Sequence, residues 1–200
     1  PVPASPLFED RDGSRWVFGT LECPVADLKA AGQRGGGSIS DAFVAALLGG
    51  LDRYHRAHGV GVDDISVSLP ISLARADDPM GGGRFAGALL ALPLDVEDPE
   101  DRIATIRGEV LSLRTEPALG SIRLIAPVAN RLPASLVVAA VELGSVADLA
   151  VSTVPGVAHA VYMAGALVEK VYPFGPLPGS ALMAALISHN GTAGIGITID

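Results

Sequence analysis

The sequence is poor in several residue types that define common protein classes. It has one cysteine, Cys23, in 200 residues, which excludes an internal disulfide and a multi-cysteine zinc site and favours a reducing compartment. Aromatic residues make up only 4% of the chain. No apolar run is long enough to cross a bilayer, and the first residues lack the basic and apolar regions of a signal peptide. Together these absences predict a soluble, cytoplasmic protein.

Basic side chains are also scarce, and they are scattered. The 14 basic residues are twelve arginines with Lys29 and Lys170, against 22 acidic residues, so the formal net charge is −8. A nucleic-acid-binding face needs basic residues clustered on one surface, so we do not expect a nucleic-acid partner. Hydrophobic residues, by contrast, make up 49%, which predicts a folded α/β domain and not a disordered chain.

Apolar periodicity predicts a mixed sheet flanked by helices. Residues 1–14 are rich in proline and charge and predict a linker or a domain-entry arm, not a folded element, so the domain is expected to span 15–200. Strands are expected at 16–21, 65–70, 88–92, 149–154, 160–163, 165–172, 181–188 and 193–199. Helices are expected from Pro24, from a cap at Ser38 or Ser40 to about His58, from Asp98, and near 120–130 and 133–143. This order is not a clean βαβ alternation, so it favours an α+β layer over a doubly wound parallel fold.

Local motifs do not supply a self-sufficient active site. The tract Gly35–Gly37 precedes a helix but lacks the Gly-Lys-[Ser/Thr] ending of a phosphate-binding loop. His55 and His58 have a spacing compatible with metal ligands, but no third ligand stands at a telling distance, and we interpret them as solvent-facing. No Gly-x-Ser-x-Gly nucleophile motif is present. We therefore expect no catalytic residue, metal or cofactor in this chain.

Ordered segments of the chain resemble the motifs of one family. The segments 38–47, 67–73 and 83–93 are similar to T-V-N-D-V-V-L-A, V-P-V-S-L-R and G-N-R-F-G…L-P, and Asp98-Pro99 follows as D-P. Further along, 152–156, 171–176 and 188–191 are similar to S-N-V-P-G, V-Y-P-F-G-P and S-Y-N-G. This ordered set, between Arg15 and Asp200, resembles the bacterial wax ester synthase/diacylglycerol acyltransferase family.

The resemblance implies the C-terminal half of a two-lobed acyltransferase of the chloramphenicol-acetyltransferase-like superfamily. It implies that the general base is the second histidine of a His-His-x-x-x-Asp-Gly motif in an N-terminal lobe, and that motif is absent here. This chain would then form tunnel wall and part of the surface for acyl-CoA, a substrate and not a cofactor. The implied acceptor is diacylglycerol or a long-chain alcohol, and the implied partners are the N-terminal lobe and, peripherally, a membrane or lipid droplet. Because the chain ends on an expected strand, the lobe also reads as trimmed before a terminal helix.

The matching positions imply a set of substrate-binding residues. The set is Ser40, Asp41, Ser152, Thr153, Pro155, Gly156 and Asn190. Ser40, Gly83 and Thr153 stand where the motifs have asparagine, and each replacement removes a paired donor and acceptor. A non-catalytic acyl- or lipid-binding lobe, or an interaction lobe, is therefore an alternative. Asp41 in a first helical turn and Asn190 in a type I′ hairpin turn also have purely structural interpretations.

A lobe that packs on another lobe should expose an unusually large apolar surface. Two segments are the candidates for this surface, Val171–Phe174 and Ala181–Ile187, because they hold more apolar side chains than one sheet face can bury.

Overall fold

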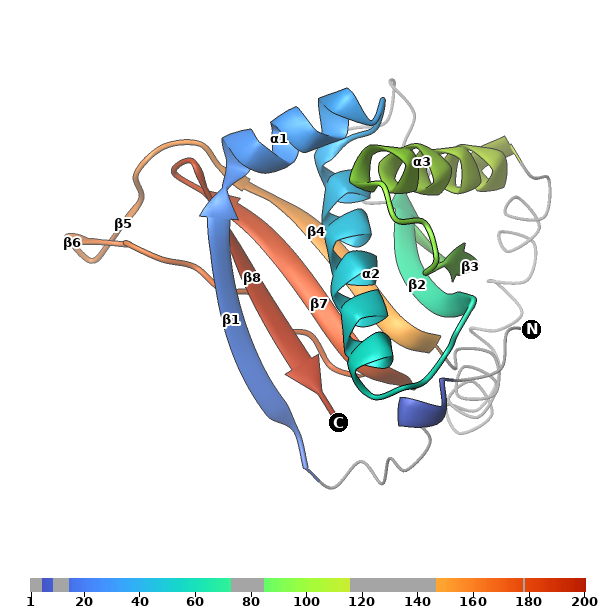
Figure 1. Cartoon of the computed structure of the whole chain (residues 1–200). Helices are drawn as coiled ribbons and strands as arrows, with labels where there is room; N and C mark the ends of the chain where they lie inside the picture. The colour runs from blue at the N-terminus through green and yellow to red at the C-terminus, as the bar shows by residue number, and fades with distance from the viewer. Residues whose placement is uncertain (1–4, 9–14, 73–84, 116–146, 178) are drawn as a thin grey trace, which may run out of the picture.

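In the part of the chain that a computed structural model describes, three α-helices cover one face of a six-stranded sheet (Figure 1). The structure describes residues 5–8, 15–72, 85–115, 147–177 and 179–200. Its elements are η1 (Pro6–Phe8), β1 (Val17–Pro24), α1 (Val25–Arg34), α2 (Ile39–Ala57), β2 (Asp64–Ser72), β3 (Phe85–Pro93), α3 (Pro99–Thr115), β4 (Ala147–Val157), β5 (Tyr162–Met163), β6 (Ala166–Leu167), β7 (Ser180–His189) and β8 (Thr192–Ile199). The helices predicted near 120–130 and 133–143 and the whole 74–84 loop, with its tract Gly81–Gly83, lie outside the described residues.

The sheet is mixed, which confirms the predicted fold class. Its strand order is β1-β8-β7-β4-β2-β3. Strand β4 runs parallel to β2 and to β7, and the other neighbours are antiparallel. Parallel neighbours cannot be joined by a tight turn, and α3 lies in the connection that leads to β4. No helix within these described ranges is both long and apolar enough to span a membrane.

The two longest helices begin at capping residues. Ser38, and not Ser40, caps α2, because the Ser38 Oγ accepts the Asp41 N–H at 3.3 Å and Asp41 Oδ2 accepts the Ser38 N–H at 2.7 Å. At the start of α3, Asp98 Oδ1 accepts the N–H groups of Glu100 and Asp101 at 2.8 and 3.1 Å. The first amides of a helix have no partner within the helix, so these acceptors determine where each helix starts.

The hydrophobic core lies between the helices and one face of the central strands. Its largest fully buried side chains include Phe43, Leu48, Ile106, Leu149 and Leu186. Burial of each such side chain stabilises the fold by about 1.5–3 kcal/mol. Because side chains alternate across a strand, Leu149 and Val151 of β4 and Ala184 and Leu186 of β7 all point into this core.

The opposite face of the sheet is covered at β8 by the segment 171–175. A Cβ on Gly194 would lie 2.0 Å from the carbonyl oxygen of Val171, and one on Gly196 would lie 1.8 Å from that of Pro173. These glycines therefore allow a second backbone to lie directly on the strand. Strands at 160–163 and 165–172 were expected, but the structure has only the two-residue strands β5 and β6 there, which pair with each other in a separate hairpin, and the residues from Val171 lie across β8.

The segment Ser5–Phe8 packs on the domain, and it holds a short helix where no folded element was expected. It contains the short helix η1, and Ser5 is 1% exposed. The Ser5 N–H donates to Asp148 Oδ1 at 3.0 Å, at the start of β4. This contact joins residues 143 positions apart in the sequence, so no local pattern could have indicated it.

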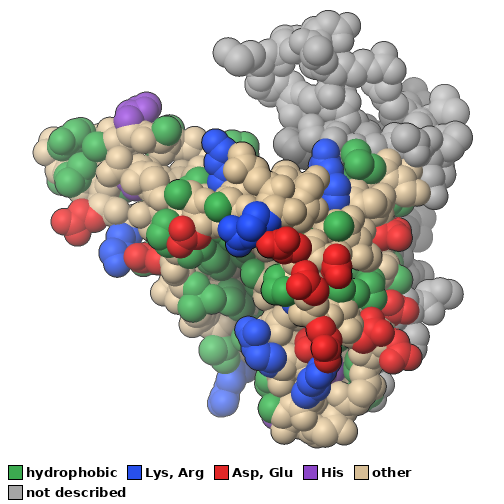
Figure 2. Space-filling view, turned by 45° about the horizontal axis from the view of Figure 1, so that its top comes forward, with side chains coloured by type: hydrophobic (Ala, Val, Ile, Leu, Met, Phe, Trp, Pro, Cys, Tyr) green, Lys and Arg blue, Asp and Glu red, His purple; other side chains and the backbone are tan. Residues whose placement is uncertain are grey.

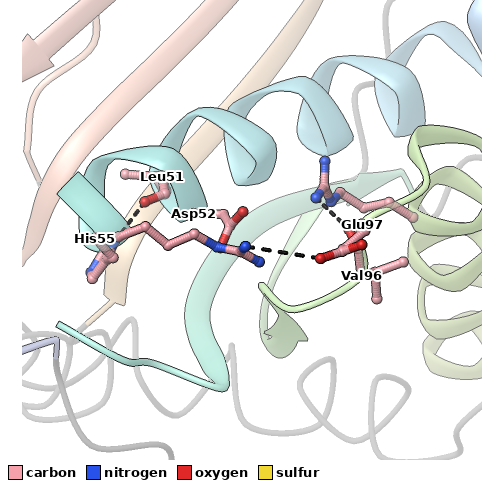
Figure 3. Close-up of polar contacts among 7 residues, drawn as sticks. Leu51, Asp52, His55, Val96 and Glu97 are labelled. Carbon is pink, nitrogen blue, oxygen red and sulfur yellow. Dashed lines mark hydrogen bonds and ion pairs between the residues drawn. The ribbon is translucent and has the colours of Figure 1, made fainter. Parts of the chain in front are cut away.

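His55 is buried, which corrects the interpretation of it as solvent-facing. It is 2% exposed, its Nδ1 lies 2.7 Å from the Leu51 carbonyl oxygen, and its Nε2 lies 2.6 Å from Ser5 Oγ. The polar side of α2 does carry Arg56, which donates to Asp52 and approaches Glu97 (Figure 3). His55 lies next to these polar residues in the sequence, but its side chain is buried because the segment Ser5–Phe8 covers it.

Apolar side chains are exposed at one edge of the sheet and on the β5–β6 hairpin. Val17 and Leu21 of the edge strand β1 are 55% and 56% exposed, and Met163 of the hairpin is 73% exposed. The hairpin projects away from the sheet (Figure 1). Figure 2 shows hydrophobic side chains gathered between the hairpin and the helices.

The expectation that 181–187 is exposed is wrong, because β7 is a central strand covered on both faces.

Candidate functional site

Strand β4 and the turn after β7 carry five of the seven predicted site residues. The two strands are parallel, so their C-terminal ends lie at the same edge of the sheet. Pro155, Gly156 and Asn190 lie at this edge, and Ser152 and Thr153 lie farther back along β4, beside the middle of β7. Ser152 and Thr153 are half-buried, and the other three are exposed. We call this edge the β4–β7 end.

Gly156 is the point of closest approach between the two strands. The register shifts between Val154 and Val157, and the Gly156 N–H donates to Ser188 Oγ at 3.1 Å. A Cβ on Gly156 would lie 1.6 Å from the Ser188 carbonyl oxygen. Only glycine fits at this distance, so Gly156 has a structural requirement beside any binding role. Ser188 was not in the predicted set, although it opens the segment similar to S-Y-N-G.

Asn190 forms the turn between β7 and β8. Asn190 and Gly191 have φ angles of 46° and 83°, which confirms the type I′ hairpin turn expected from the Asn-Gly pair. The Asn190 N–H donates to the Val157 carbonyl oxygen at 2.9 Å, so the turn also fastens the end of β4. The carboxamide side chain itself is exposed at the β4–β7 end.

Ser40 and Asp41 belong to a different group, at the start of α2. Asp41 is 4% exposed, and its Oδ2 accepts from both the Ser38 N–H and the Ser38 Oγ, at 2.7 and 2.8 Å. Arg107 of α3 lies 3.6 Å from the same oxygen. These contacts explain the buried carboxylate by helix capping and by the link between α2 and α3. A substrate-binding role for Ser40 and Asp41 stays a prediction.

A small hollow lies beside the β4–β7 end. Its lining includes Glu22, Glu169, Lys170, Tyr172, His189 and Thr192. Lys170 Nζ lies 2.8 Å from Glu22 Oε1, and the Tyr172 hydroxyl donates to the same oxygen. The hydrogen bond from Lys170, followed by that from Tyr172, lowers the pKa of Glu22. In turn, the hydrogen bond that Lys170 makes with Glu22 raises the pKa of Lys170, and the one that Tyr172 makes with Glu22 raises the pKa of Tyr172.

His189 is a residue of this hollow that the sequence reasoning did not select. It is 6% exposed, and its Nε2 lies 2.9 Å from the Val168 carbonyl oxygen. The sequence feature that could have marked His189 is its departure from the similar motif S-Y-N-G, which has tyrosine at this position. In the part of the chain that the structure describes, histidine, cysteine and acidic side chains do not form a group of three that could hold a metal ion.

Solved structures of two enzyme classes share this fold. The wax ester synthase/diacylglycerol acyltransferase from Marinobacter aquaeolei VT8 matches with a TM-score of 0.70 and 20% identity, over 100% of this chain and 46% of that one. The cyclization-docking bidomain of a nonribosomal peptide synthetase from Sorangium cellulosum matches with a TM-score of 0.59 and 13% identity, over 99% and 40%. The chain therefore has the chloramphenicol-acetyltransferase-like fold.

Sequence similarity then identifies the family. The profile of the WS/DGAT C-terminal domain matches residues 81–200. A protein of Mycobacterium tuberculosis strain H37Rv, provisionally named a diacylglycerol O-acyltransferase, is 39% identical over 182 residues, which cover 90% of this chain and 37% of that protein. A second one is 31% identical over 189 residues, 90% of this chain and 38% of that protein. The chain belongs to the wax ester synthase/diacylglycerol acyltransferase family, and it spans less than two fifths of the length of these relatives.

Proposed function

We propose that the chain is the C-terminal lobe of an acyltransferase that moves a long-chain acyl group from acyl-CoA to diacylglycerol or a long-chain alcohol. Membership of the family carries this proposal, together with the position of Pro155, Gly156 and Asn190 at the β4–β7 end. In this proposal the lobe works in the cytoplasm, as one half of a longer protein.

The chemistry in this proposal is divided between two lobes. In the preceding lobe, the second histidine of His-His-x-x-x-Asp-Gly takes the proton of the acceptor hydroxyl. The alcohol oxygen then attacks the thioester carbonyl, the C–S bond breaks, and the CoA thiolate leaves and takes up the proton. The present lobe contributes tunnel wall and part of the acyl-CoA surface. Its hydroxyl and carboxamide groups at the β4–β7 end are suited to hydrogen-bond polar parts of a ligand.

The exposed apolar residues support a partner lobe. Val17, Phe18 and Leu21 of β1 are more than half exposed, as are Tyr162 and Met163 of the hairpin. At about 25 cal/mol per Å², covering such side chains contributes substantially to association. We assign these two surfaces to the preceding lobe of the same protein. Contact of the hairpin with a membrane or lipid droplet is the competing assignment.

Acyl transfer from palmitoyl-CoA tests the division of labour. We expect turnover by the two-lobed protein and none by the 200-residue chain, because removal of a general base costs about two to four orders of magnitude. The control is replacement of the histidines of this chain one at a time. Turnover by the 200-residue chain that survives each replacement would contradict a base in the preceding lobe.

A non-catalytic acyl- or lipid-binding lobe is the second candidate function. It is favoured by one observation, that Ser40, Gly83 and Thr153 stand where the family motifs have asparagine. Binding and turnover separate the two candidates when measured on the two-lobed protein. Acyl-CoA binding without transfer to either kind of acceptor would favour the binding lobe.

A further inference from the structure

The β5–β6 hairpin has little support of its own. Its strands have two residues each, paired between Tyr162 and Leu167 and between Met163 and Ala166. All four side chains are exposed. An isolated two-stranded hairpin is only marginally stable in water. The direction in which this hairpin points must therefore depend on the contacts at its base.

One dipeptide holds both legs of the hairpin at that base. On the outgoing leg, the Val157 carbonyl oxygen accepts the N–H of Asn190 at 2.9 Å. On the returning leg, the Val168 carbonyl oxygen lies 2.9 Å from Nε2 of His189. The two legs are joined to each other by the Val168 N–H, which donates to the Val161 carbonyl oxygen at 2.8 Å.

The contact from His189 is the one that depends on a side chain. A carbonyl oxygen can only accept, so Nε2 of His189 carries the hydrogen. Only 6% of His189 is exposed, and water therefore competes weakly for this hydrogen bond. A tyrosine, as in the similar motif S-Y-N-G, would place its donor farther from the backbone.

We propose that His189 is a positioning residue that fixes the returning leg of the β5–β6 hairpin and thereby aims its apolar tip at the preceding lobe. The first half of this proposal concerns the chain by itself. The second half rests on the proposed function, in which the hairpin contacts that lobe.

Two variants and one matched control test the proposal. His189→Phe keeps a ring but removes the donor, and His189→Gln keeps an N–H donor. The control is Thr198→Val, because Thr198 is fully buried and its Oγ1 donates to the Gly175 carbonyl oxygen at 3.2 Å, on the segment that follows the hairpin. It removes the same kind of bond but leaves the base of the hairpin intact.

The first measurement is hydrogen exchange of the Val168 amide in the 200-residue chain, which does not depend on the proposed function. Loss of one buried hydrogen bond should speed this exchange about tenfold in His189→Phe, with partial rescue in His189→Gln and no change in Thr198→Val. Equal exchange rates in His189→Phe and in Thr198→Val would overturn the positioning role.

The second measurement is acyl transfer by the two-lobed protein carrying the same variants. We expect a loss of about tenfold in His189→Phe, rescue in His189→Gln, and activity within about twofold of the parent in Thr198→Val. Faster exchange with unchanged transfer would overturn the aiming of the hairpin at the preceding lobe. Absence of transfer in the parent protein would instead contradict the proposed function, and the exchange result would still decide the role of His189.

Discussion

The hydroxyl of Ser5 and the imidazole of His55 lie 2.6 Å apart, between Oγ and Nε2, and both residues are almost fully buried. His55 Nδ1 lies 2.7 Å from the Leu51 carbonyl oxygen and donates to it, and in the tautomer with its hydrogen on Nδ1 the Nε2 atom accepts the Ser5 hydroxyl. This bond, with the edge-on contact between the Phe8 and His55 rings, fastens the segment before the sheet to the end of α2.

The Ser5–His55 bond should contribute measurably to stability. Ser5→Ala would leave Nε2 of a buried imidazole without a partner, and we expect a loss of about 1–3 kcal/mol in the free energy of unfolding. Urea denaturation of Ser5→Ala, His55→Leu and the double variant gives the coupling energy. Losses that add exactly in the double variant would contradict a direct interaction.

Asp41 should behave as a capping residue. Asp41→Ala removes the acceptor for the Ser38 N–H and the partner of Arg107, and we expect a loss of about 1–2 kcal/mol in stability. Asp41→Asn keeps an acceptor oxygen and should lose less. Denaturation and acyl transfer by the two-lobed protein are measured together. A loss of transfer far larger than the loss of stability in Asp41→Asn would show that the carboxylate serves the substrate.

Gly156→Ala should be strongly destabilising. Its Cβ would lie 1.6 Å from the Ser188 carbonyl oxygen, so the backbone at the β4–β7 end must move. We expect a loss of about 3 kcal/mol or more, at the upper end of single substitutions. Gly19→Ala is the matched control in a strand, since a Cβ there meets nothing within 4 Å. A thermal midpoint that falls equally in both variants would contradict the close approach at Gly156.

The Glu22–Lys170 pair should make stability depend on pH at both extremes. The pKa of Glu22 is lowered by Lys170, so its contribution is present above the ordinary carboxyl pKa of about 4.3 and is lost as the pH falls through the lowered pKa. The pKa of Lys170 is raised by Glu22, so its contribution is lost as the pH rises through that raised value.

The midpoint of urea denaturation, measured as a function of pH, checks this dependence. We expect Glu22→Gln to flatten the profile in the acid range, and added salt to reduce the difference between Glu22→Gln and the parent, because the pair is solvent-exposed. Parallel profiles for Glu22→Gln and the parent protein below about pH 5 would contradict the assignment.

The sequence by itself determined the parts of the fold that depend on neighbours in the chain. The Ser38–Asp41 spacing, the Asp98-Pro99 pair and the Asn190-Gly191 pair specify two helix starts and a turn, because each satisfies backbone groups or φ angles within a few residues. Alternation of apolar residues also indicated the strands of a mixed sheet. The ordered motifs sufficed to indicate the family.

Tertiary structure alone decided which surfaces are covered. His55 stands on a polar helix side, yet it is buried by Ser5, 50 positions away. The apolar segment 181–187 was expected to be exposed but occupies a central strand, whereas β1, with Val17, Phe18 and Leu21, lies at an edge and is uncovered. Likewise, the hydrogen bond between His189 Nε2 and the Val168 carbonyl oxygen joins residues 21 positions apart. Such contacts depend on the order of the strands in the sheet and on the path of segments that are distant in the sequence. The pattern of residues within one segment contains neither kind of information.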